Sequence, residues 1–145
     1  MEKSIRQLAL AGLKIATTTS SEILETDYLV IGAGATGMAF VDEMIHHSRN
    51  KIILVDKRDR PGGYWVDTYD FDHLHQPPAN YGVNSRPLGG RGSDRITKTQ
   101  ILAYYELVLA DLLKTGRLKY YPQCEYRGQL CTIRAGTTHI VYNTI

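Results

Sequence analysis

Three glycines in the first half of the chain follow an apolar run, Tyr28 to Ile31, in the stretch GAGATG. The first glycine permits a sharp turn, the second lets the backbone approach a phosphate, and the third lets a following helix press against a sheet. A pyrophosphate would then meet the N-terminus of that helix, where unpaired N–H groups and the helix dipole favour an anion. The residues that we expect to line the pyrophosphate are Gly32, Gly34, Ala35, Thr36 and Gly37.

An acidic residue, Asp56, follows the glycine motif at the distance that a dinucleotide-binding site requires. Asp56 lies 24 residues after Gly32, at the end of a second apolar run, Ile52 to Val55. A carboxylate in this place accepts hydrogen bonds from the hydroxyls of an adenosine ribose, and it repels a 2′-phosphate. Between the two runs, Met38, Val41 and Ile45 recur at helical spacing and give a helix an apolar face. The alternative to a dinucleotide-binding turn is an ordinary strand-to-helix turn in another kind of α/β protein.

A glycine pair, Gly62 and Gly63, follows the acid and is itself followed by Trp65. With this pair the chain resembles the two-dinucleotide-binding-domain flavoproteins over residues 27–126. Within them it is most similar to flavin-dependent monooxygenases of the Baeyer–Villiger and dimethylaniline type. The resemblance implies FAD as cofactor, with Lys57 near the adenine edge and Gly62, Gly63 and Trp65 near the flavin half. The alternative for Trp65 is an ordinary core aromatic.

Residues 61–96 show no clear period and are rich in Gly, Pro, Asp, Asn and His. Long irregular segments inside a compact domain are usually functional, and in the resembling families this segment wraps the flavin ring. We therefore expect flavin contacts from His75, Gln76 and Asn84, although the histidines could equally be surface loop residues. No third ligand stands at a suitable spacing, so we expect no metal site.

Composition favours a single domain. The 145 residues are 43% apolar with a formal net charge of +2, and the basic residues are scattered among acids, which gives little support for nucleic-acid or membrane partners. No apolar run is long enough to span a membrane. We expect a cytoplasmic protein with an N-terminal extension, residues 1–26, and one domain, residues 27–145. Cys124 and Cys131 are expected to be structural thiols, since they lack the spacing of a redox pair.

The second half of the chain predicts further elements of the same fold. Thr97 and Gln100 have capping-box spacing before a helical pattern that ends at Gly116, and residues 117–121 read as a third parallel strand. Residues 130–134 and 138–143 flank a glycine and predict an antiparallel hairpin. The fold class is therefore α/β: a Rossmann-like FAD/NAD(P)-binding fold with an incomplete parallel sheet and a C-terminal β-hairpin or meander.

Two features of the resembling families have no counterpart here. The sequence has neither a second glycine motif for NADPH nor a Phe-x-Gly-x-x-x-His pattern. We therefore interpret the chain as the FAD-binding portion of a flavin-dependent oxidoreductase, in whose full-length relative NAD(P)H would donate hydride to the flavin. The partner would be a dinucleotide and an unidentified small-molecule substrate; no catalytic residue is assigned. The alternatives are a truncated non-catalytic remnant or binding partner, and an NAD-dependent dehydrogenase.

Overall fold

A three-stranded parallel sheet forms the middle layer of the molecule. The computed structural model describes residues 22–127, 130–133 and 138–143. Strand β2 (Tyr28–Ile31) pairs with β3 (Ile52–Val55), and β3 pairs with β6 (Leu118–Tyr121), in the order β2-β3-β6. Helix α2 (Ala35–His47) connects the first two strands, and helix α4 (Lys98–Leu113) precedes the third. The predicted β-α-β unit and the third strand are therefore confirmed.

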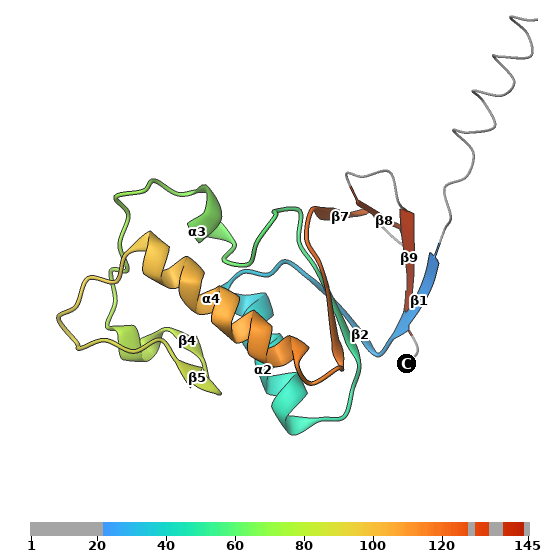
Figure 1. The fold of residues 1–145 in the computed structure, drawn as a ribbon, viewed down its shortest axis with the longest axis horizontal. Helices are drawn as coiled ribbons and strands as arrows, with labels where there is room; N and C mark the ends of the chain where they lie inside the picture. Colours follow the sequence, from blue (N-terminus) through green and yellow to red (C-terminus); the bar gives the residue numbers. More distant parts are fainter. Residues whose placement is uncertain (1–21, 128–129, 134–137, 144–145) are drawn as a thin grey trace, which may run out of the picture.

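The two faces of the sheet bury different partners (Figure 1). Along β3 every residue is buried, and alternate side chains point to opposite faces. Ile52 and Leu54 pack with helices α2 and α4, whereas Ile53 and Val55 pack with Leu24 from the other side. The continuous apolar run of β3 follows from this double burial.

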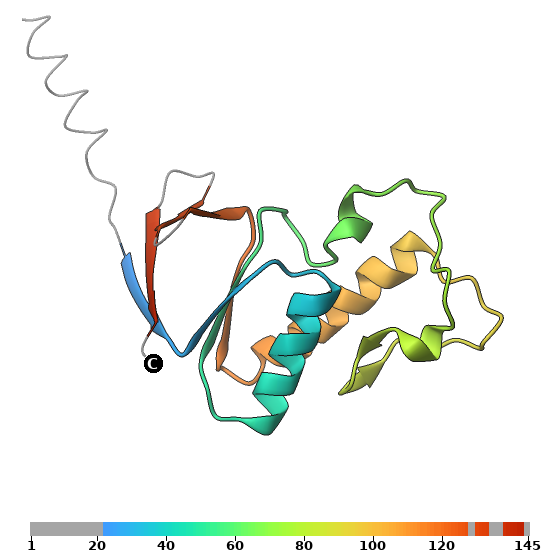
Figure 2. The ribbon, with the colours of Figure 1, turned by 180° about the vertical axis from the view of Figure 1, so that it is seen from behind.

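A second sheet covers the face opposite the helices, as Figure 2 shows from behind. It contains β1 (Glu22–Thr26), β9 (Thr138–Asn143), β8 (Leu130–Ile133) and β7 (Cys124–Arg127), in the order β1-β9-β8-β7. Strands β8 and β9 are antiparallel, which confirms the predicted hairpin, and β1 joins β9 in parallel. Strands β1 and β7 had no signal in the sequence.

One expectation about the cysteines is wrong. Cys124 is buried and disulfide-bonded, not a thiol. It begins β7, and β7 pairs antiparallel with β8.

Helix α4 begins as its sequence predicts. The Thr97 hydroxyl accepts a hydrogen bond from the Gln100 amide, and the Gln100 side chain accepts one from the Thr97 amide, which completes the capping box. Its buried face, including Ile101, Tyr105 and Val108, joins the main core. No helix in the described ranges is long and apolar enough to cross a membrane.

The segment between β3 and α4 folds into short pieces instead of one irregular loop. They are α3 (Tyr64–Asp67), a 3-10 turn (Pro78–Asn80), and the hairpin of β4 (Gly82–Val83) and β5 (Arg86–Pro87). The hairpin is fastened to both helices. The buried Asp42 of α2 accepts from the amide and hydroxyl of Ser85, and the hydroxyl of Tyr104 of α4 bridges the hairpin backbone.

Candidate functional site

The glycine-rich turn joins β2 to α2 at the carboxyl end of the parallel sheet. Gly32 has a φ of +99°, a region that favours glycine, and its amide donates to the Val55 carbonyl at 2.7 Å. Gly34 is the N-cap of α2, so Ala35, Thr36 and Gly37 form the first helical turn. No side chain caps this helix N-terminus. Its amides therefore remain available to an anion.

The two glycine motifs pack directly against each other. A Cβ on Gly63, where φ is +57°, would lie 2.7 Å from the Gly34 Cα, which is closer than real Cβ contacts allow. Next to this contact the Gly62 amide donates to the Ala33 carbonyl at 2.8 Å. Residues 29 positions apart in the sequence thus form one glycine-lined surface beside the start of α2.

Asp56 lies at the same edge of the sheet and is only 3% exposed. Its Oδ2 accepts from the Ala33 amide at 2.6 Å, and its Oδ1 accepts from the Arg58 amide at 2.8 Å. A carboxylate has about four acceptor positions, so each oxygen retains capacity for a ligand hydroxyl. The backbone bonds orient the carboxylate toward the glycine turn.

A cavity of about 220 Å³ opens beside this acid. Its walls come from the ends of β2 and β3 and from the start of β7: Ile31, Gly32, Val55, Asp56, Lys57, Arg58, Cys124, Glu125 and Tyr126. Lys57 is exposed at its rim, whereas Ile31 and Tyr126 expose apolar surface, 58% and 38% of their areas. A space with an acid on one side and apolar side chains on the other suits a nucleoside.

An ion pair not anticipated from the sequence connects the segment after the acid to α3, across the glycine pair. The Arg58 guanidinium donates from Nε, at 2.8 Å, and from Nη2 to the same Oδ2 of Asp67 in α3. These bonds hold the pKa of the Asp67 carboxyl below its ordinary value and raise the pKa of Arg58. Both groups are charged at neutral pH. The Arg-Asp pair nine residues apart has no recognisable motif.

Trp65 is largely buried, with 9% of its area exposed. Its indole N–H donates to the Tyr81 hydroxyl at 2.7 Å, and its ring meets those of Tyr64 and Tyr81 edge-on. The side chain thus helps to form the core below the loop segment. One edge also lines a second cavity.

This second cavity, of about 340 Å³, brings Trp65 together with His75 and Gln76. His75 is 92% exposed, and its Nε2 lies 3.7 Å from Oδ1 of Asp72. Asn84 lies apart from this group. It sits in the turn between β4 and β5, where its side-chain amide donates to Glu43 of α2.

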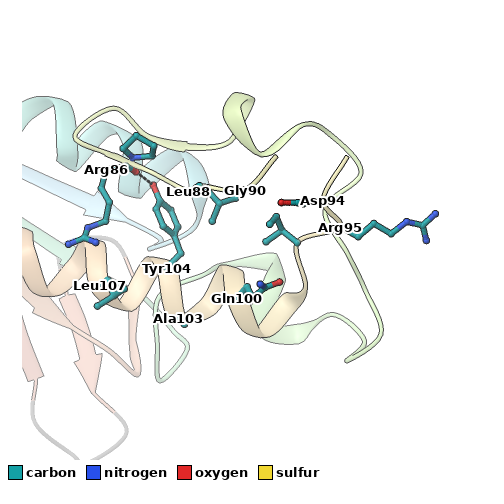
Figure 3. A pocket seen from close by; sticks show the side chains of 12 residues that line it. Arg86, Leu88, Gly90, Asp94, Arg95, Gln100, Ala103, Tyr104 and Leu107 are labelled. Carbon is teal, nitrogen blue, oxygen red and sulfur yellow. Dashed lines mark hydrogen bonds between the residues drawn. The ribbon is translucent and has the colours of Figure 1, made fainter. Parts of the chain in front are cut away.

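A third cavity, of about 640 Å³, lies away from the glycine turn (Figure 3). One wall is the face of α4 with Gln100, Ala103, Tyr104 and Leu107, and the other is β5 with the following loop. The Tyr104 hydroxyl is occupied, because it donates to the Arg86 carbonyl at 2.6 Å and accepts from the Val83 amide. Figure 3 shows the Arg95 side chain pointing out of the cavity.

The sequence is similar to known proteins. Residues 30–93 match the family described as an NAD(P)-binding Rossmann-like domain. The uncharacterized protein Rv2000 of Mycobacterium tuberculosis is 44% identical over 138 residues, which cover 86% of this chain and 26% of that protein. The chain thus spans about a quarter of the length of the curated relatives it matches.

Solved structures agree at the level of fold. A flavin-containing monooxygenase from Stenotrophomonas maltophilia superposes with a TM-score of 0.62 at 18% identity, over 81% of this chain and 36% of that one. A cyclohexanone monooxygenase variant from Rhodococcus sp. Phi1, bound to NADP+, gives 0.61 at 22% identity, over 81% and 25%. This chain therefore has a Rossmann-like fold similar to that of the flavin monooxygenases.

Proposed function

We propose that this chain binds FAD and forms the cofactor-binding part of a flavin-dependent oxidoreductase. The observation that carries the proposal is the packing of Gly63 against Gly34, next to an uncapped helix N-terminus and a buried acid. A Cβ on Gly63 would meet the Gly34 backbone, so this close packing requires glycine at position 63. It leaves backbone surface where a pyrophosphate must approach closely.

The first turn of α2, Asp56 and Lys57 would each contact a different part of the cofactor. The amides of Gly34, Ala35, Thr36 and Gly37 would hold the pyrophosphate, with the positive end of the α2 dipole behind them. The two oxygens of Asp56 would accept from the adenosine ribose hydroxyls, while the Ala33 and Arg58 amides keep the carboxylate in place. Lys57 would border the adenine.

The flavin half of the cofactor would extend past the glycine pair. Gly62 and Gly63 would permit its approach. The residues that follow this pair in the sequence, among them Trp65, His75 and Gln76, line a cavity that would take the flavin half. Asn84 is the more distant candidate, because Glu43 already engages its amide. Bound FAD would supply a hydride acceptor, with NAD(P)H as the donor in the longer relatives. This chain's residues would bind and orient it.

Retention of FAD tests the proposal. The purified chain is incubated with FAD and desalted, and its visible absorbance is recorded beside that of Asp56→Ala and of Asp59→Ala. Asp59 is an exposed acid three residues further along and provides a matched control. We expect flavin absorbance to remain with the wild type and Asp59→Ala and to be lost from Asp56→Ala. Binding of NADH without retention of FAD would favour a dehydrogenase, and binding of neither would reject the proposal.

A further inference from the structure

The Arg58 side chain lies beside the acid that would hold the adenosine ribose. Its Nη1 is 3.8 Å from Oδ1 of Asp56, and the side chain is only 22% exposed. A guanidinium in this position is well suited to a ribose 2′-phosphate, because its planar fork matches phosphate oxygens. Arginine near the ribose is how dinucleotide sites generally accommodate that phosphate.

In this chain the Arg58 guanidinium is engaged by a carboxylate of α3. Nε and Nη2 both donate to Asp67, whose carboxylate is 61% exposed and also lies within the field of Lys57 and Lys98. The Arg58 backbone is fixed as well, since its carbonyl accepts from the Gln123 amide at 2.8 Å. The guanidinium therefore has little freedom to reorient while Asp67 holds it.

We propose that Asp67 is a specificity-determining residue: by holding Arg58, it keeps this cation from a 2′-phosphate and restricts the site to dinucleotides with an unphosphorylated adenosine ribose. This inference rests on the proposed dinucleotide site. It adds a second discriminating acid to Asp56, which acts by repulsion, and it places that acid on α3, outside the glycine motif. The competing explanation is that the ion pair only ties α3 to the end of β3.

The test compares two probes, ADP-ribose and 2′-phospho-ADP-ribose, by isothermal titration calorimetry. Asp67→Asn releases Arg58 and should raise affinity for the phosphorylated probe about tenfold relative to ADP-ribose, the worth of a charge-assisted contact. Adding Arg58→Met should abolish that gain.

A second ion pair provides the matched control. Arg86 donates from Nε and Nη2 to Oδ2 of Asp111 with the same pattern, away from the glycine turn. Asp111→Asn should therefore leave the preference between probes unchanged. An equal loss of affinity for both probes in Asp67→Asn, or no change in their ratio, would overturn the inference and assign the pair a purely structural role. A wild-type chain that binds neither probe would instead reject the proposed function.

Discussion

Gly37 shows at the scale of one residue why the glycine motif cannot vary. A Cβ built there would lie 1.9 Å from the Gly32 carbonyl oxygen and 3.5 Å from the Val30 side chain. The first of these neighbours is backbone, so it cannot rotate away. The residue thus sets the distance between the start of α2 and the end of β2.

Substitution of Gly37 by alanine should destabilise the fold despite a better helix former being introduced. Alanine gains up to about 1 kcal/mol in helix propensity, whereas overpacking against backbone costs about 1–3 kcal/mol or more. We expect a net loss in the free energy of unfolding, measured by urea denaturation. Gly92→Ala is the control, because nothing lies within 4 Å of its Cβ position. Equal stability of the two variants would contradict the close approach.

Asp72 gives the stability of the loop segment a predictable pH dependence. Hydrogen bonds from the hydroxyls of Thr68 and Tyr64 lower its pKa below the ordinary 3.8, as does one from the His73 amide. A carboxyl whose pKa is lower in the folded state than in the unfolded state stabilises the fold at pH values above the unfolded-state pKa. This stabilisation is lost as the pH falls through the folded-state pKa. Thermal unfolding should therefore occur at lower temperature as the pH drops below 3.8. The unfolding temperature of Asp72→Asn should fall less steeply with decreasing pH than that of the wild type. Identical slopes for the two proteins would refute the role of Asp72.

Two tyrosines on neighbouring elements offer a contrast at the scale of helices and strands. On α4, the Tyr104 hydroxyl bridges the backbone of β4 and β5, and burial raises its pKa. On β6, the buried Tyr120 hydroxyl has no hydrogen-bond partner among the described residues. Burial and the nearby Asp56 charge raise the pKa of Tyr120, so it stays neutral.

Replacing each of these tyrosines by phenylalanine should separate the two roles. Tyr104→Phe leaves a buried amide and carbonyl of the hairpin unsatisfied and should cost about 1–3 kcal/mol. Tyr120→Phe removes only an orphaned hydroxyl and should be neutral or stabilising by up to about 1 kcal/mol. Chemical denaturation of both variants measures the difference. A larger loss in Tyr120→Phe than in Tyr104→Phe would contradict these hydrogen-bond assignments.

The elements with strong local signals could be predicted from the sequence, and those that depend on distant contacts could not. The parallel strands, α2 and the capped α4 have apolar periodicity or caps written within a few residues. Strand β1 depends instead on pairing with β9 over a hundred residues away. The hairpin at Gly82–Pro87 depends on Asp42 and Tyr104, which are buried polar groups of helices.

The same division holds for the candidate site. The glycines and Asp56 were predicted because their spacing alone encodes a turn, a helix start and a strand end. The contact between Gly34 and Gly63 emerges only when α3 folds onto the turn. The pair of Arg58 with Asp67 likewise depends on where α3 lies, and each residue alone resembles any surface charge.

At the scale of the whole molecule, three layers bring the glycine turn and Asp56 together at one edge of the parallel sheet. The helices, the parallel sheet and the second sheet lie side by side in Figure 1, and the ends of β2 and β3 meet where α2 begins. Ligands of open α/β sheets bind at the carboxyl ends of the strands. The cavity of about 640 Å³ beside α4 lies elsewhere.

Backbone amide NMR shifts on titration with ADP-ribose distinguish these two places most directly. Our account predicts that the largest shifts fall on Ala33, Gly34 and the first turn of α2, together with Arg58 and Gly63. Shifts confined to the cavity formed by residues 86–107, or an unchanged spectrum at saturating ligand, would contradict dinucleotide binding at the glycine turn.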